Sequence, residues 1–93
     1  MGERPIVYRR DRCGYCRNLE HRLRAAGVEY ESRDIWADPA AAAFVRSVNG
    51  GAETVPTVVL GERVLVNPPP ADLLRELGVE QPPRRRWSPF GGR

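Results

Sequence analysis

Lysine is absent from this 93-residue sequence, cysteine occurs only twice, and no long apolar run interrupts the chain. A membrane-spanning helix needs roughly 20 consecutive apolar residues, and a secretory signal needs an apolar core behind its N-terminus. Neither pattern is found here. Secreted domains of this size usually carry a framework of several disulfides. These absences argue against membrane-spanning and disulfide-stapled proteins, and we expect a cytoplasmic protein.

The net charge of +3 is concentrated near the C-terminus. Residues 79–93 contain four arginines and one glutamate, a net +3, whereas the charges of residues 1–78 sum to zero. Residues 79–93 also show no helical or strand periodicity, so we predict one domain over 1–78 and a flexible, solvated tail over 79–93. All basic residues are arginines, which we interpret as coding bias. The cluster Arg84-Arg85-Arg86-Trp87 could dock on nucleic acid, a membrane surface or a partner, but a solvated tail is the simpler expectation, so we expect no nucleic-acid partner and no membrane partner.

Apolar periodicity and turn residues predict seven elements within residues 1–78. These are a strand at 6–8, a helix from Cys13 to Gly27, a strand at 28–35, a helix capped by Asp38 that ends at 49–51, a strand hairpin at 54–66 and a short helix that ends at Gly78. The first strand–helix–strand unit makes two parallel strands through a right-handed crossover. The order β-α-β-α-β-β-α therefore predicts an α/β thioredoxin fold, a four-stranded mixed β-sheet flanked by three helices.

The two cysteines, in the sequence CGYC, lie at the predicted start of the first helix. Unpaired backbone N–H groups at a helix N-terminus favour an anion, so we expect Cys13 to react as a thiolate nucleophile. Gly14, unlike proline, keeps its N–H available to that sulfur. Cys16 lies one turn further on the apolar face, and we expect it to be buried, less ionised and able to resolve a mixed disulfide on Cys13. A structural disulfide is disfavoured because so short a loop removes little unfolded-state entropy.

The sequence Thr54-Val55-Pro56 stands just before the third predicted strand. Proline cannot donate to a strand ladder, so a proline at this point favours a cis bond that bends the chain. The bend would turn the backbone of Val55 outward, where a thiol substrate could pair with it. An ordinary trans proline at the strand start is the alternative.

Together these motifs resemble the glutaredoxin family, and the succession SVNGG, TVPTV and VNP is most similar to mycoredoxins, which use mycothiol in place of glutathione. The resemblance covers residues 6–77. It implies an oxidoreductase that reduces mixed disulfides through Cys13, with mycothiol or glutathione as reducing co-substrate, oxidised client proteins as partners, a monomeric state, and neither bound cofactor nor metal. It also implies a thiol-substrate site formed by Arg12, Gly14, Tyr15, Thr54, Val55, Pro56 and Asn67.

Two departures from the family pattern bear on the choice of thiol. Residues 67–70 read Asn-Pro-Pro-Pro where glutathione-binding members have two glycines and a polar residue that hold the γ-glutamyl end. Because mycothiol is uncharged, the loss of this clamp fits mycothiol. In the other direction, Arg9, Arg10 and Arg12 crowd the cysteine turn, and arginine is a good carboxylate partner. A charged thiol or an acidic protein client therefore stays open.

Other functions remain as alternatives. Glutaredoxins with glycine in the second position of the motif can share a [2Fe–2S] cluster between subunits, which would make the chain a cluster carrier. The sequence WSPF at 87–90 resembles a segment of redoxins that serve ribonucleotide reductase with electrons from thioredoxin reductase, although it follows the last predicted helix. Zinc is disfavoured because Cys13, Cys16 and His21 are too few ligands.

Two aromatic residues are assigned by their positions in the predicted elements. Tyr8 lies in the first strand and is expected in the core. Trp36 follows the second strand, at the edge of the sheet where ligands of parallel units bind. It could form a wall of the thiol groove, but packing on the second helix is the simpler expectation.

Overall fold

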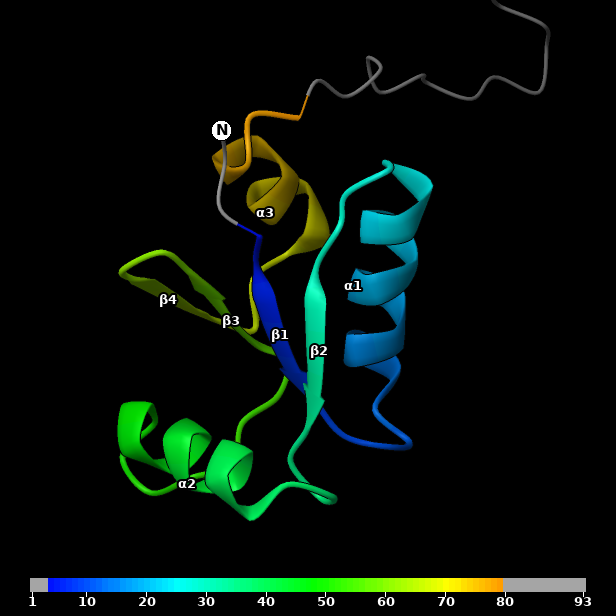
Figure 1. Ribbon diagram of the computed structural model, residues 1–93. Coiled ribbons are helices and arrows are strands. Elements are labelled where there is room, and N and C mark those ends of the chain that lie inside the picture. The colour runs from blue at the N-terminus through cyan, green and yellow to red at the C-terminus, as the bar shows by residue number, and fades with distance from the viewer. Residues whose placement is uncertain (1–3, 80–93) are drawn as a thin grey trace, which may run out of the picture.

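Seven elements follow one another in the predicted order in a computed structural model, which describes residues 4–79 (Figure 1). They are β1 (Ile6–Arg9), α1 (Gly14–Ala25), β2 (Glu31–Asp34), α2 (Pro39–Val48), β3 (Thr57–Leu60), β4 (Arg63–Val66) and α3 (Pro70–Glu76). The predicted tail, including the arginines at 84–86 and the sequence WSPF, lies outside the described residues, apart from Val79.

The four strands form one mixed sheet in the order β2-β1-β3-β4. β1 is parallel to β2 and antiparallel to β3, and β3 is antiparallel to β4. Tyr8 is the register partner of both Arg33 and Thr57, and Thr57 is in turn paired with Val66. This arrangement confirms the predicted fold, with β1 at the centre and its C-terminal end leading to the cysteine motif.

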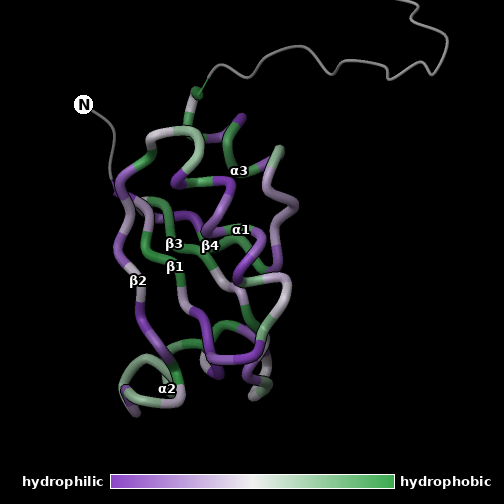
Figure 2. Tube along the Cα trace, turned by 90° about the vertical axis from the view of Figure 1, so that its right-hand side faces the viewer, coloured by the Kyte–Doolittle hydropathy of each residue, from purple (hydrophilic) through white to green (hydrophobic). Residues whose placement is uncertain are grey.

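Successive side chains of β1 enter two different apolar cores, because side chains alternate between the faces of a strand. Val7 packs with Leu19 and Leu23 of α1 and with leucines of α3, whereas Tyr8 packs with α2. α1 and α3 therefore cover one face of the sheet, and α2 lies against the other (Figure 1). In Figure 2 the central strands carry green, hydrophobic stretches and the edge strand β2 is mostly purple.

The strand expected at 28–35 is shorter than predicted, since β2 begins at Glu31. The Val28 N–H donates to Leu23 O (2.9 Å), and Gly27 has a positive φ of 74°. These residues therefore close the C-terminus of α1 instead of joining the sheet. Similarly, β3 begins at Thr57 rather than at residue 54, because Pro56 has no N–H to donate.

Asp38 caps α2 as predicted. Its side chain accepts hydrogen bonds from Ala40 N (3.0 Å) and Ala41 N (3.3 Å). The buried face of α2 comprises Ala41, Ala42 and Val45. The ring of Tyr8, buried as expected, stacks on Phe44 with ring centroids 4.9 Å apart. This packing holds the C-terminal half of β1 against α2.

Two further observations concern membrane-spanning helices and metal ligands. No helix within residues 4–79 has the length and apolar character required to cross a membrane. Within the same residues, no three His, Cys, Asp or Glu side chains gather as metal ligands would, and His21 is exposed on α1.

Replacing Asp38 by alanine tests the cap of α2. The change leaves two backbone N–H groups without their acceptor, so Asp38→Ala should lower the free energy of unfolding by about 1 kcal/mol, whereas Asp38→Asn should retain most of it. Glu29→Ala is the control, because its exposed ion pair with Arg4 contributes less than about 0.5 kcal/mol. Urea denaturation followed by circular dichroism measures all three. Equal stability of Asp38→Ala and Glu29→Ala would contradict the assignment.

Candidate active site

Cys13 is the N-cap residue of α1, with the extended backbone angles φ −109° and ψ 106°. Its Sγ atom accepts a hydrogen bond from the Cys16 backbone N–H at 3.2 Å, and its carbonyl accepts from Arg17 N at 3.0 Å. The donor to the sulfur is thus Cys16 and not Gly14, whose N–H we expected to serve. A Cβ atom at Gly14 would have no neighbour within 4 Å, so the site has space for a small side chain there.

The two thiols are both free but differ in their surroundings. Cys13 is 8% exposed, at the rim of the sheet, whereas Cys16 is only 1% exposed. Burial, followed by a hydrogen bond with Cys13, raises the pKa of the Cys16 thiol from 9.0 to about 12. Cys16 is therefore a protonated thiol at neutral pH, as its place on the apolar face predicts.

The loop before β3 lies next to the Cys13 sulfur. The Val55–Pro56 bond is cis, as predicted, and the Cys13 thiol points to Val55 O at 4.0 Å. Among the described residues, the Val55 N–H has no hydrogen-bond partner. The loop therefore presents both a free backbone donor and a carbonyl beside the thiol.

Hydrogen bonds from two neighbouring elements hold this loop in place. The Thr57 hydroxyl donates to Thr54 O at 2.7 Å. The Asn49 side chain, at the end of α2, donates to Val45 O (2.9 Å) and to Thr57 Oγ1 (3.4 Å). Sequence reasoning used Asn49 only as part of a helix stop, because nothing local indicates its contact with β3.

Asn67 connects the other side of the loop to the segment that leads into α3. Its N–H donates to Pro56 O at 2.7 Å, and its backbone adopts a positive φ of 48°. A pocket of about 290 Å³ opens here, lined by Tyr15, Asn18, Asn67, Pro68, Pro69 and Pro70. No charged side chain lines it, and Tyr15 is 73% exposed. Of the lining residues, Asn18 was missed from sequence, where it is one exposed polar residue of a helix among several.

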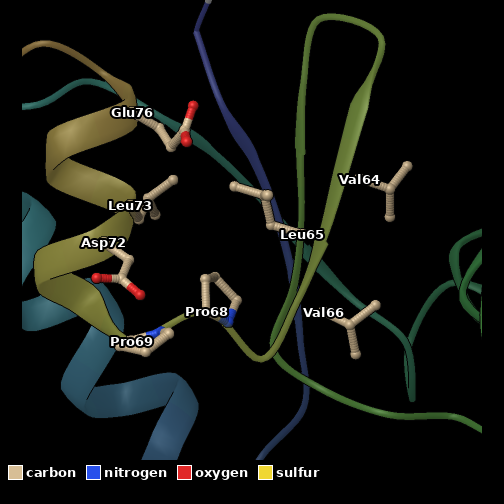
Figure 3. Close-up of a pocket in the computed structure, with 8 residues that line it drawn as sticks. All are labelled: Val64, Leu65, Val66, Pro68, Pro69, Asp72, Leu73 and Glu76. Atoms are coloured by element: carbon tan, nitrogen blue, oxygen red, sulfur yellow. The ribbon is translucent and has the colours of Figure 1, made fainter.

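A second pocket, of about 320 Å³, lies between β4 and α3 and shares Pro68 and Pro69 with the first (Figure 3). In Figure 3, Leu65 points from β4 toward α3, and Asp72 and Glu76 mark the helix side. Both carboxylates already have partners, Asp72 with Arg75 and Glu76 with Arg63. The second pocket contains no thiol.

The arginines of the cysteine turn have different surroundings. Arg9 is half-buried, and its guanidinium lies 2.8 Å from Glu20, 3.5 Å from Asp34 and 3.6 Å from Asp11. Arg10 instead lies over the ring of Trp36, 5.6 Å from its centroid.

Trp36 and Arg12 are both exposed at this turn. Trp36, for which packing on α2 was the simpler expectation, is 60% exposed and lies outside the apolar cluster at α2, and Arg12 is exposed with a positive φ of 62°. Of the residues predicted for thiol binding, Val55 lies beside the Cys13 thiol, and Tyr15 and Asn67 line one pocket, whereas Arg12 is exposed.

A family model and several named proteins are similar to this chain. A family model described as Glutaredoxin matches residues 6–65. A protein of Mycobacterium tuberculosis that is named as a glutaredoxin is 44% identical over 66 residues, which are 71% of this chain and 79% of that protein. Mycoredoxin 1 of Corynebacterium glutamicum is 44% identical over 52 residues, 56% of this chain and 63% of its own length.

Solved structures show the same fold. A crystal structure of a mutant thioredoxin-like protein aligns with a TM-score of 0.75 and 26% identity, and covers 84% of this chain and 99% of its own. The family match spans more than half of the sequence, including both cysteines and the cis-proline loop. With the M. tuberculosis relative identical at 44% of positions over most of the domain, the chain belongs to the glutaredoxin family.

Proposed function

We propose that the protein is a thiol–disulfide oxidoreductase that removes low-molecular-weight thiols from mixed disulfides through Cys13. The observation that carries this proposal is the position of the Cys13 sulfur at the N-terminus of α1, where it accepts the Cys16 N–H at 3.2 Å. A backbone donor and the helix dipole both stabilise negative charge on that sulfur. The thiolate is the form that attacks disulfides.

The reaction then proceeds in two exchanges. The Cys13 thiolate attacks the sulfur of the small thiol in a mixed disulfide, a new S–S bond forms, and the client leaves as a thiolate that takes up a proton. A second molecule of the small thiol, as thiolate, attacks the same sulfur, releases Cys13 and leaves as a symmetric disulfide. The client is reduced and the small thiol is oxidised, so the cycle requires no bound cofactor.

Cys16 supplies its backbone N–H to this cycle even where its thiol takes no part. Its side chain is the second thiol that can displace a client from Cys13 and close an intramolecular disulfide. Because its pKa is raised to about 12, this resolving step is slow at neutral pH. A chain of this length with only two cysteines is typical of a reducing compartment, and we place the activity in the cytoplasm.

We propose mycothiol as the small thiol. The pocket between the first turn of α1 and residues 67–70 offers the phenol of Tyr15 and the amides of Asn18 and Asn67, without a charged group. Neutral hydrogen-bonding groups next to an exposed aromatic ring suit an uncharged, hydroxyl-rich thiol better than the dicarboxylate glutathione. The similarity to mycoredoxin 1 supports the same choice.

Substitution of each cysteine tests the division of roles. Cys13→Ser should abolish turnover, whereas Cys16→Ser should retain most of the mycothiol-linked activity, because serine keeps the backbone N–H that reaches the Cys13 sulfur. NADPH consumption with one mixed-disulfide substrate measures this, with mycothiol, glutathione or thioredoxin reductase supplied in turn. Turnover only with thioredoxin reductase would overturn the mycothiol proposal, and an inactive Cys16→Ser protein would indicate a dithiol mechanism.

Removal of the Asn67 amide tests the pocket. Asn67→Gly preserves the positive φ and the N–H bond to Pro56 but deletes one hydrogen-bonding side chain, which is worth about 1 kcal/mol. We expect KM for the mycothiol mixed disulfide to rise about fivefold with little change in kcat. A glutathione mixed disulfide assayed on the same variant is the control. A similar rise for both substrates would show that Asn67 does not select the thiol.

Alkylation of Cys16 tests its raised pKa. The Cys13→Ser variant leaves Cys16 as the sole thiol, and iodoacetamide should label it slowly in the folded protein at pH 8 but rapidly in urea. The native rate should continue to rise with pH toward about 12, whereas the rate in urea should level off above about pH 9, the ordinary range of a thiol. Mass spectrometry follows the label. Equal rates in the folded and unfolded protein would contradict the assignment.

A further inference from the structure

The arginines of the described residues fall into two classes. Seven have a carboxylate within 4.0 Å: Arg4, Arg9, Arg24, Arg33, Arg46, Arg63 and Arg75. The structure gives four others in residues 4–79 no such partner: Arg10, Arg12, Arg17 and Arg22. Three of these four surround Cys13 in sequence, so the cations that lack a carboxylate partner are concentrated in the segment that carries the reactive thiol.

Arg10, Arg12 and Arg17 lie in segments directly adjacent to Cys13. Arg10 and Arg12 lie in the connection from β1 to Cys13, and Arg17 follows in the first turn of α1, where its N–H bonds the Cys13 carbonyl. Arg12 and Arg17 are exposed. Arg22 lies further along α1, about 13 Å along the helix axis from Cys13.

Acidic groups at this end of the sheet are already engaged. Asp11, Glu20 and Asp34 all face Arg9, and Asp38 accepts two backbone N–H groups of α2. The N-termini of α1 and α2 add partial positive charge. These carboxylates therefore have partners within the protein, although the Asp11 side chain stays 67% exposed, whereas Arg10, Arg12 and Arg17 have no carboxylate of residues 4–79 within 4.0 Å.

An exposed aromatic ring lies beside these cations. The indole of Trp36 is held under Arg10, and its backbone N–H donates to Asp34 Oδ1 at 2.8 Å. Figure 1 shows the β2–α2 connection, which carries this residue, at the same end of the sheet as the start of α1. Tryptophan and arginine are the residues most enriched at the energetic centres of protein interfaces. This pair, an exposed indole with a half-buried arginine over it, therefore favours a protein substrate.

We propose that Arg10, Arg12, Arg17 and Trp36, here called the arginine face, bind an acidic segment that flanks the oxidised cysteine of a protein client. The inference rests on the proposed function and specifies its substrate class. In the first exchange, Cys13 attacks the small-thiol sulfur, the mixed disulfide breaks, and the client cysteine leaves as a thiolate. The arginine face holds the acidic segment during this step and stabilises the departing negative charge. A second small thiol then regenerates Cys13.

Two synthetic peptides test the proposal with the full chain. Each carries one cysteine in mixed disulfide with mycothiol, flanked either by aspartates or by serines. We expect kcat/KM for the acidic peptide to exceed that for the neutral peptide about tenfold at low salt, and the ratio to approach one in 0.5 M NaCl, where screening removes the attraction. A ratio near one at both salt concentrations overturns the proposal.

Charge-reversal variants test which arginine produces the preference for the acidic peptide. Arg17→Glu should lower the acidic-to-neutral ratio about tenfold, whereas Arg22→Glu, the matched control on the same helix, should leave it within about twofold. Equal loss in both variants would indicate net charge rather than the arginine face.

These assays distinguish two outcomes: that the protein does not prefer acidic clients, and that it lacks the proposed oxidoreductase function. If the wild-type protein turns over the neutral peptide and does not prefer the acidic one, the proposed function holds and only the preference for an acidic client is contradicted. Absence of turnover with every mixed disulfide removes the proposed function itself. Binding of a labelled RNA oligonucleotide that depends on Arg17, without preference for the acidic peptide, would assign the arginine face to nucleic acid and overturn the proposal.

Discussion

The hydrogen bond from the Cys16 N–H to the Cys13 sulfur is the contact on which the site depends. It forms because Cys13 is still extended, as the residue that caps α1, while Cys16 is already helical. Leu19 and Leu23 fix α1 to the sheet, and β1 delivers the chain to its first residue. The backbone therefore positions the reactive sulfur, and Cys16 contributes to this even with its own thiol protonated.

The opposite wall of the site is held by contacts between segments that are distant in sequence. Asn49 ties the end of α2 to Thr57, and Thr57 ties β3 to the loop before the cis bond. Asn67 then joins that loop to the start of α3. Hydrogen bonds from Thr57 and Asn67 hold this loop on both sides. They therefore fix the position of the Val55 backbone beside the thiol, as pairing with a substrate requires.

Local rules were sufficient for the order of elements, the cysteine cap and the cis bond at Pro56, since each depends on a few neighbouring residues. Local rules failed at positions whose structure depends on contacts with residues distant in sequence. The backbone turn that closes α1 takes residues 28–30 away from the expected strand. Asn18 and Asn49 acquire their roles only when α1 meets the α3 connection and α2 meets β3. Trp36 is 60% exposed and has Arg10 over its ring, a contact that its position after β2 does not indicate.

Two adjacent arginines illustrate how the fold distributes charge. Arg9 and Arg10 follow one another at the end of an extended strand, so their side chains leave on opposite sides. Arg9 enters a partly buried space that contains Glu20 and Asp34, where unpaired carboxylates would be costly, and it neutralises them. Arg10 has no such carboxylate and lies half-buried over the ring of Trp36. The positive charge that a substrate encounters at Cys13 therefore depends on which arginines form ion pairs within the protein, and not on the number of arginines in the turn.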